Sequence, residues 1–356
     1  MRIILDGMGG DNAPADIVEG AVLASKEMEH EIVIAGDEAL ISAELSKYKY
    51  DKSKVTILAT TEVITTAESP TKAIRTKKDS SMVRGMQEVK DGNADMFLSA
   101  GNSGALLAGG IFVIGRIKGI DRPALGSTYP ILGSGIALLV DAGANADVKP
   151  GNLLEFAYMG SIYMKEVLGV KNPRVGLVNL GTEPGKGTKI LKDAYPLLEN
   201  SGQKKLINFV GNVEGRDVPF GEADVIVCDG LVGNVILKLT EGLALSILSL
   251  LKQKFMTNVK TKLAAVMLGK QMGEMKKEFD YSEYGGAPIL GIKKPIIKVH
   301  GSATANMVKS GIISALPYIE KDVVGTITEH VKELKAIEEE QKEEQTEEQN
   351  KEEISS

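Results

Sequence analysis

The sequence predicts an α/β fold in three layers, with helices on both faces of a mostly parallel β-sheet. Three observations favour it: short apolar runs alternate with longer helical segments, the runs end in Gly, Asp, Asn or Pro, and 39 of the 356 residues are glycine. Such alternation is the βαβ rhythm of a parallel sheet. Aromatic residues make up only 4% of the chain and tryptophan is absent, so Ile, Leu, Val, Ala and Met must fill the core, as in buried parallel strands.

The expected elements follow in order from the amino terminus. A strand at Ile3–Leu5 leads through a glycine turn to a helix at about residues 14–28, and Glu31–Ile34 forms the next strand. Further strands are expected at residues 55–58, 96–98, 136–140, 175–180, 207–210, 225–228 and 296–299. Helices are expected at residues 80–90, 103–114, 153–168, 188–200, 235–251 and 302–316.

One catalytic domain, residues 1–334, accounts for this pattern, with a helical projection at about residues 243–279 that interrupts it. The projection lacks proline and is predicted to be one long helix or a helical hairpin, with breaks at Gly269 and Gly273. Residues 335–356 hold nine glutamates and three lysines and so carry the whole net charge of -6. This acidic tail is expected to be marginally helical or disordered.

Composition also bears on the compartment. The single cysteine, Cys228, forms no internal disulfide, and its apolar run Val-Ile-Val-Cys predicts a buried strand residue rather than a nucleophile. No secretory signal precedes the first strand, and no apolar stretch is judged to approach the roughly 20 residues that span a bilayer. We therefore expect a cytoplasmic protein whose membrane contact is peripheral.

Four loops rich in Gly, Asn and Ser follow expected strands and predict an anion site. They are residues 6–12, 99–104, 179–187 and 229–234. Such loops meet at the carboxyl edge of an open α/β sheet, where backbone N–H groups at helix starts bind oxyanions. For any one loop, however, the glycines are explained equally well by the need to reverse the chain between a strand and a helix. Neither GxxxxGK[ST] nor GxGxxG occurs, and no metal-ligand spacing stands out, so no cofactor, metal or nucleic-acid partner is expected.

Four polar side chains, three of them within these loops, are candidates for chemistry. Lys186, a cation among glycines, is placed to neutralise a phosphate or a developing oxyanion, against the alternative of a solvated loop lysine. Asn234 either caps a helix or donates its amide to a ligand, and Asp229 either orients neighbouring donors or only begins a turn. His300, at a strand end before a helix, serves as a general acid, a ligand contact or a structural hydrogen-bonding group.

Six motifs, read in order, resemble those of the phosphate acyltransferase (PlsX) family. They are MRIILDGMGGDNAP at 1–14, SAGNSGA at 99–105, LVDAGAN at 139–145, NLGTE at 179–183, DGLVGN at 229–234 and HGSA at 300–303. The resemblance covers about residues 1–330 and leaves out only the acidic tail.

The resemblance implies a fold similar to phosphotransacetylases and to isocitrate and isopropylmalate dehydrogenases, usually in a homodimer. The implied reaction moves a fatty acyl group from acyl carrier protein to inorganic phosphate, and the acyl phosphate then feeds a membrane acyltransferase (PlsY) that starts phospholipid synthesis. Phosphate is already largely ionised at neutral pH, so the chemistry needs no Ser-His or Cys-His nucleophile.

Site residues follow from the resemblance together with the loop chemistry. Lys186 and Asn234 are predicted to position phosphate and stabilise the tetrahedral oxyanion, with support from His300 and Asn102. Phosphate or substrate contacts are expected from Asp6, Gly9, Asn12, Asn102, Ser103, Gly181, Thr182, Asp229 and Ser302.

The projection is basic and amphipathic. Residues 252–277 hold seven lysines and one glutamate beside apolar residues at helical spacing. This pattern suits an anionic membrane surface, an acidic carrier protein, or a dimer interface with solvated lysines. The expected contact residues are Lys252, Lys254, Phe255, Val259, Lys260, Lys262 and Leu263.

Two other functions are compatible with the residues. One is a short-chain phosphotransacetylase that uses coenzyme A, which would share the fold and an acyl phosphate product. The other is an inactive scaffold at the membrane surface. The basic projection favours a protein or membrane-associated acyl donor over a soluble thiol, and the lysine, asparagine and histidine loops argue against the scaffold.

Overall fold

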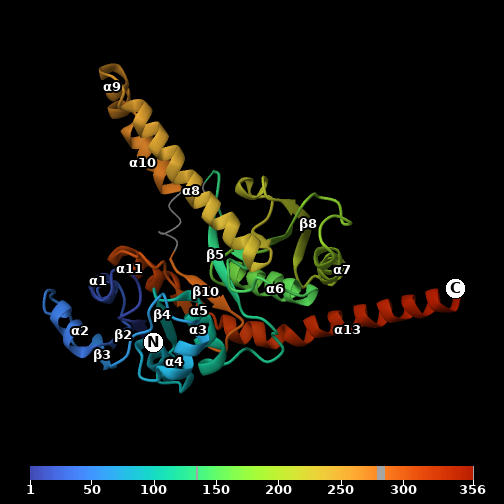
Figure 1. Ribbon diagram of the computed structural model, residues 1–356, viewed down its shortest axis with the longest axis horizontal. Coiled ribbons are helices and arrows are strands. Elements are labelled where there is room, and N and C mark those ends of the chain that lie inside the picture. The colour runs from blue at the N-terminus through green and yellow to red at the C-terminus, as the bar shows by residue number, and fades with distance from the viewer. Residues whose placement is uncertain (134, 279–284, 356) are drawn as a thin grey trace.

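The computed structural model describes residues 1–133, 135–278 and 285–355, and shows one mostly parallel sheet with helices on both faces (Figure 1). The expected α/β/α fold class is therefore confirmed. Side chains are described except those of residues 274, 276–278, 338 and 341–355.

The first part of the chain alternates strands and helices as expected. Its elements are β1 (Arg2–Asp6), α1 (Ala15–Ser25), β2 (Glu31–Gly36), α2 (Glu38–Leu45), β3 (Val55–Ala59), α3 (Pro70–Thr76), α4 (Ser81–Lys90), β4 (Met96–Ser99), α5 (Ser103–Gly109) and the π-helical turn η1 (Gly110–Ile114).

The second part contains the longest helices. Its elements are β5 (Ala124–Ile131), β6 (Gly135–Val140), α6 (Pro150–Glu166), β7 (Arg174–Asn179), α7 (Lys189–Gln203), β8 (Asn208–Glu214), η2 (Val218–Phe220), β9 (Val225–Val227), α8 (Gly230–Phe255), α9 (Val259–Met267), α10 (Gly269–Glu278), β10 (Ala287–Leu290), β11 (Ile296–Lys298), α11 (Ala305–Ser314), α12 (Leu316–Glu320) and α13 (Val323–Ser355).

The strand order is β3-β2-β1-β4-β11-β10-β5-β6-β9-β7-β8. The strands β3, β2, β1, β4 and β11 form one parallel half of the sheet. The strands β6, β9, β7 and β8 form the other. Between them β10 is antiparallel to β11 and to β5, and β5 is antiparallel to β6. The two halves therefore run in opposite directions, so the four glycine loops do not all follow strands of one direction, as the prediction assumed.

Neither β5 nor β10 was expected from the sequence, and both contain proline. Pro130 lies in β5 and Pro288 in β10. Proline cannot donate to a strand ladder, so its presence argues against a central strand. These two strands reverse the sheet direction, which the pattern of parallel strands alone did not show.

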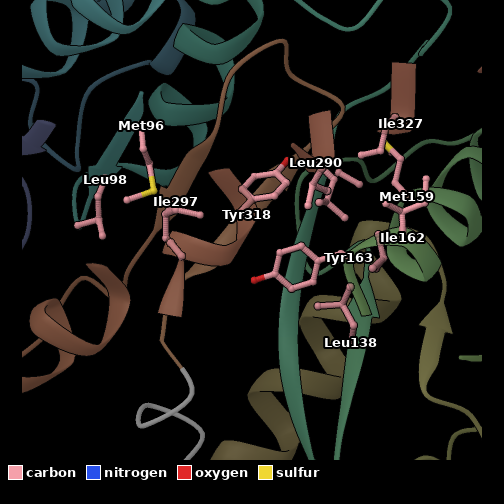
Figure 2. Packing of buried hydrophobic residues seen from close by; sticks show 14 of the residues in the cluster. Met96, Leu98, Leu138, Met159, Ile162, Tyr163, Leu290, Ile297, Tyr318 and Ile327 are labelled. Carbon is pink, nitrogen blue, oxygen red and sulfur yellow. The ribbon is translucent and has the colours of Figure 1, made fainter. Parts of the chain in front are cut away.

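Successive strand residues face opposite layers. In β1, Ile3 and Leu5 pack under α1 and α11, whereas Ile4 packs with Phe97 under α4 and α5. Figure 2 shows the first of these clusters continuing from Leu98 of β4 past Leu290 of β10 to Leu138 of β6. The two halves thus share one core, which supports a single domain.

The projection is formed by α8, α9 and α10, with α9 at its far end (Figure 1). It has a break at Met256–Asn258 that was not expected, where Asn258 caps α9 through a capping box with Thr261, and a second break at Leu268, next to the expected Gly269. Gly269 begins α10 and Gly273 lies inside it.

Helix α8 is long and apolar for a helix that is mostly exposed. Among the described residues it is the one helix long and apolar enough to cross a bilayer, and only 6% of its apolar window is buried. The expectation that no apolar stretch approaches this length is therefore wrong. Length and composition alone do not show that α8 spans a membrane.

Residues 335–355 of the acidic tail form the second half of α13, which is the helical one of the two expected alternatives. Glu, Lys and Gln are good helix formers, so they can extend a helix whose first part is anchored. The anchor reaches beyond residue 334, since Ile337 is buried and Lys335 pairs with the buried Glu155 at 2.9 Å. We therefore place the end of the packed domain near residue 337.

Candidate active site

A cavity of about 610 Å³ lies between the two halves of the sheet. Its wall combines Ser103, His300 and Ser302 from the first half with Gly143 and Asn234 from the second. Helix α8 makes this possible because it begins after β9 and packs on β5, where Thr240 Oγ1 lies 2.9 Å from Tyr129 OH. Four of the predicted site residues thus share one cavity.

One face of α8 supplies the cavity wall, and its character changes along the helix. Polar residues Asn234, Lys238 and Glu241 lie toward its start. Leu237 lies among them, and beyond Glu241 the same face is apolar at helical spacing. Its residues there are Ala244, Leu245 and Leu248. The wall therefore offers a polar end for a charged group and an apolar end for a hydrocarbon.

The start of α8 is fixed by Asp229, not by Asn234. The Asp229 carboxylate accepts hydrogen bonds from the N–H groups of Leu231 and Val232, both at 2.9 Å, which makes it the N-cap. Gly233 lies so close to the Asp141 carbonyl that a side chain would collide with it. The amide of Asn234 is therefore not used for capping and lines the cavity. Asp229 contributes to the site by fixing the start of the helix that carries Asn234.

Asp141 holds the neighbouring loop that lines the cavity at Ala142 and Gly143. This buried carboxylate accepts hydrogen bonds from the N–H groups of Leu125, Gly143, Ala144 and Asn145 at 2.6–3.1 Å. Burial nevertheless raises the pKa of Asp141. The LVDAGAN motif thus forms a loop that the Asp141 carboxylate holds in place. The sequence resemblance alone did not show this structural role.

His300 is set to donate a hydrogen bond from Nε2. The Ser302 N–H donates to Nδ1 at 3.2 Å, and the Ser302 hydroxyl lies 2.8 Å from the same nitrogen. A backbone N–H can only donate, so Nδ1 is the acceptor and Nε2 carries the proton. Partial burial and, secondarily, the charge of Lys238 lower the pKa of His300. At neutral pH the ring is therefore an uncharged donor rather than a cation.

Lys298, absent from the sequence-based candidates, also lines this cavity. Burial lowers its pKa to about 8, although the charges of Asp6 and Asp11 oppose the shift. It lies in KKPIIK, where a lysine-rich run suggests solvent exposure. The available signal was its place in the apolar strand expected at residues 296–299, directly before His300.

The loop after β1 is organised from within. Asp6 accepts hydrogen bonds from the hydroxyls of Ser81 at 2.6 Å and Ser99 at 2.7 Å, and burial raises its pKa. A side chain at Gly9 would meet this carboxylate. Asn12 donates to the Ala303 carbonyl at 3.3 Å. Asp6, Gly9 and Asn12 thus hold loops together and do not line the cavity.

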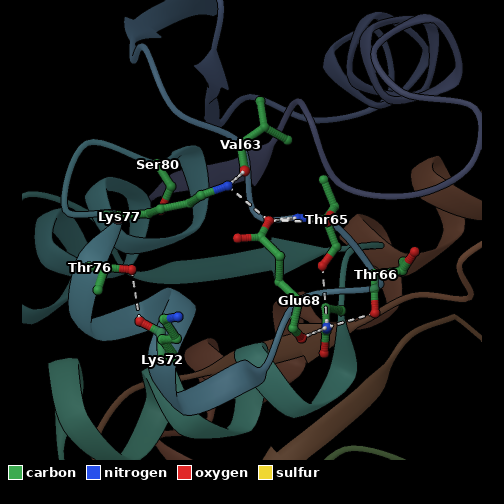
Figure 3. A network of polar contacts seen from close by, with 9 residues as sticks. Val63, Thr65, Thr66, Glu68, Lys72, Thr76, Lys77 and Ser80 are labelled. Carbon is green, nitrogen blue, oxygen red and sulfur yellow. Dashed lines mark hydrogen bonds and ion pairs between the residues drawn. The ribbon is translucent and has the colours of Figure 1, made fainter.

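Asn102 is likewise occupied by the protein. Its side chain caps α5 by accepting from Ala105 N–H at 3.0 Å and donates to carbonyls of the segment 65–68. Figure 3 shows how Glu68 ties that segment to Lys77 at 2.8 Å. The Lys77 ammonium lowers the pKa of Glu68 to about 2. Asn102 therefore positions Ser103 rather than facing the cavity.

Lys186 lies in the exposed loop after β7, outside this cavity. Its Nζ is 4.0 Å from the Glu183 carboxylate, and the loop is held by Asn179, whose amide donates to the Lys186 carbonyl at 3.1 Å. Gly181 and Thr182 belong to the same loop. The chain alone does not bring these residues to Asn234 and His300, and their role stays a prediction.

The expected contact residues of the projection are exposed with one exception. Lys252 and Lys254 end α8, and Val259, Lys260, Lys262 and Leu263 lie on α9, where no residue is buried. Phe255 is half-buried.

Neither a metal centre nor a nucleophile emerges from the described part of the chain. There, no group of three or more His, Cys, Asp or Glu side chains is arranged to hold a metal ion. Cys228 is buried in the sheet, and burial raises the pKa of its thiol, which disfavours the thiolate.

Solved structures share this architecture. A phosphotransacetylase from Streptococcus pyogenes has a TM-score of 0.58 at 16% identity, covering 90% of this chain and 94% of its own. The EutD phosphotransacetylase from Staphylococcus aureus has a TM-score of 0.56 at 15% identity, covering 89% and 94%. These likenesses confirm the expected relation in fold.

Sequence comparison is more specific. Residues 1–326 match the family described as fatty acid synthesis protein. A phosphate acyltransferase from Alkaliphilus oremlandii is 52% identical over 334 residues, which cover 94% of this chain and 98% of the relative. One from Clostridioides difficile is 49% identical over 332 residues, covering 93% and 96%. The chain therefore belongs to the phosphate acyltransferase (PlsX) family.

Proposed function

We propose that this protein transfers a fatty acyl group from the thioester of acyl carrier protein to inorganic phosphate. The observation that carries the proposal is the division of one cavity into a polar end and an apolar end. A lysine, a neutral histidine and an asparagine lie at the first, and the leucine and alanine side chains of α8 line the second. This arrangement suits an anion beside a hydrocarbon chain.

The chemistry needs only positioning and charge stabilisation. A phosphate oxygen attacks the thioester carbonyl carbon, the carbonyl oxygen becomes an oxyanion, and collapse of the intermediate breaks the carbon–sulfur bond. The thiolate leaves and takes up a proton from solvent, and acyl phosphate is formed. Asn234 and the Nε2–H of His300 donate to the oxyanion. The reactive product is then consumed by a membrane acyltransferase such as PlsY.

The test compares acyl donors on the purified chain. We expect phosphate-dependent release of free carrier protein from acyl carrier protein, with little release of coenzyme A from acetyl or long-chain thioesters. Preference for coenzyme A would instead indicate a phosphotransacetylase. Release from neither donor would leave the scaffold function and contradict the proposal.

We propose further that the tip of the projection contacts an anionic membrane surface from the cytoplasmic side. Val259 is 82% and Leu263 is 63% exposed on α9, beside the exposed Lys260 and Lys262. Wild-type protein should co-sediment with phosphatidylglycerol vesicles more than with phosphatidylcholine vesicles. Replacing Val259 and Leu263 with Gln should abolish this, whereas Leu40→Gln, an exposed apolar change on α2, should not. Equal sedimentation by all variants would contradict the proposal.

A second copy of the chain is proposed to cover the other face of α8. Opposite the cavity, exposed apolar residues recur every three or four positions. They are Leu231, Val235, Leu239, Leu243, Ile247 and Leu250, each more than half exposed. Light scattering should give twice the chain mass of 38.0 kDa, and Gln at both 239 and 243 should halve it. A wild-type monomer would contradict this interface.

A further inference from the structure

Lys298 occupies an unusual position for a lysine. It is the last residue of β11, paired with Ser99 of β4 near the middle of the sheet, and Ile297 and Val299 beside it are 1% and 4% exposed. Placing an ammonium here costs solvation free energy, so its presence calls for compensating contacts.

Two of its hydrogen bonds fix it in place. Lys298 Nζ donates to the Ala100 carbonyl at 3.0 Å and to the Val299 carbonyl. An ammonium has three N–H bonds, so one is left for another acceptor. Because the side chain also lines the cavity beside His300, that acceptor is available from a molecule bound there.

The surrounding charges leave the ammonium without a carboxylate partner. Among the described residues, none of the ion pairs within 4.0 Å involves Lys298. Asp6 of β1 acts on it electrostatically, but its oxygens accept from Ser81 and Ser99. Asp11 adds negative charge from the following loop, while Lys238 of α8 adds positive charge.

We propose that Lys298 binds the inorganic phosphate that accepts the acyl group, an inference that rests on the function proposed above. The other cations fit this role less well. Lys238 is exposed and pairs with Glu241 at 2.8 Å, and Lys186 lies outside the cavity. Lys298 is rigidly held and has a free donor beside the neutral His300.

Protonation of Lys298 and phosphate binding are then linked. Only the protonated form attracts the anion, and its pKa of about 8 places the loss of the proton within the range of ordinary assays. Phosphate is largely dianionic there, so its own ionisation does not weaken binding as the pH rises. Phosphate affinity should therefore fall as the pH passes through about 8.

The test measures binding of radiolabelled inorganic phosphate to the full chain by equilibrium dialysis. Lys298→Met should raise the Kd for phosphate by about tenfold to hundredfold, as expected for losing a charged hydrogen bond. In turnover the KM for phosphate should rise while the KM for the acyl thioester stays constant, and Lys298→Arg should recover part of the loss. Lys293→Met is the matched control, since Lys293 is exposed on the preceding loop.

Wild-type protein provides an independent arm if Lys298→Met does not fold. Its Kd for phosphate should be constant from pH 7 to 8 or fall slightly, and then rise toward pH 9. An unchanged Kd in Lys298→Met, or a wild-type Kd with no rise above pH 8, would overturn the inference. Acyl transfer by the wild type under the same conditions shows whether the proposed function itself stands.

Discussion

Asn234 and His300 show how backbone contacts set the chemistry of single side chains. Asp229 takes over the capping of α8, so the Asn234 amide is free. Ser302 fixes the imidazole tautomer, so His300 presents an uncharged Nε2–H. Both side chains therefore offer an uncharged N–H group that can donate a hydrogen bond to an anion.

Asn234→Asp tests this description because it keeps the shape and replaces a donor with an acceptor. A carboxylate would repel phosphate and the oxyanion, so we expect kcat to fall at least about a hundredfold. Thermal unfolding should change little, since Asp229 still caps the helix. Gln253→Glu adds the same charge on an exposed part of α8 and should leave kcat near wild type. Wild-type turnover by Asn234→Asp would remove Asn234 from the mechanism.

Lys186 is the sequence-based candidate that the cavity leaves out. If the loop after β7 closes on the bound substrates, Lys186→Ala should lower turnover at least about tenfold without changing the unfolding temperature. Lys189→Ala, an exposed lysine at the start of α7, is the control. Full turnover by a folded Lys186→Ala protein would refute its assignment.

Among the elements, α8 has the largest share in the site. One face forms the cavity wall, and the opposite face is exposed and apolar. From Asn234 to Leu248 the wall extends about 21 Å at 1.5 Å per residue. Distance along this helix should therefore set the length of acyl chain that the protein accepts.

Ala244→Phe tests that relation by filling the apolar end. We expect kcat/KM to fall about tenfold or more for long acyl chains and to change little for short ones, as measured with a series of acyl carrier protein thioesters. Leu40→Phe enlarges an exposed apolar side chain on α2, outside the cavity, and should keep the wild-type preference. Parallel loss for all chain lengths would argue against α8 as the acyl wall.

At the scale of the whole molecule, one core and one buried ion pair join distant segments. Glu155 of α6 is 1% exposed, pairs with Lys335 of α13 and accepts from the N–H groups of Asp121 and Arg122 at 3.0–3.3 Å. Burial raises its pKa, and Lys335 lowers it in opposition. This residue therefore links the second half of the sheet to the carboxyl-terminal helix.

Glu155→Ala should destabilise the protein by about 3 kcal/mol, because it removes three hydrogen bonds and leaves a cation near the core. Urea unfolding followed by circular dichroism measures this free energy. Glu166→Ala, a more exposed glutamate at the end of the same helix, should cost less than about 0.5 kcal/mol. Equal effects of the two changes would contradict the role given to Glu155.

The sequence predicted those parts of the molecule that depend on short runs of neighbouring residues, such as apolar strands and loop motifs. Apolar runs identified β1, β2 and β4, and the motifs identified Asn234 and His300. It missed β5 and β10, because Pro130 and Pro288 mask their strand character. It could not show that side-chain contacts within the protein occupy Asp6 and Asn102, or that Lys298, in a lysine-rich run, lines the cavity.

Phosphorus NMR combined with thiol titration tests the central claim most directly. Purified protein, acyl carrier protein thioester and inorganic phosphate should yield one acyl phosphate for each free carrier-protein thiol, and omitting phosphate should stop thiol release. Thiol release without acyl phosphate, or acyl phosphate formed only from coenzyme A thioesters, would contradict the proposed reaction.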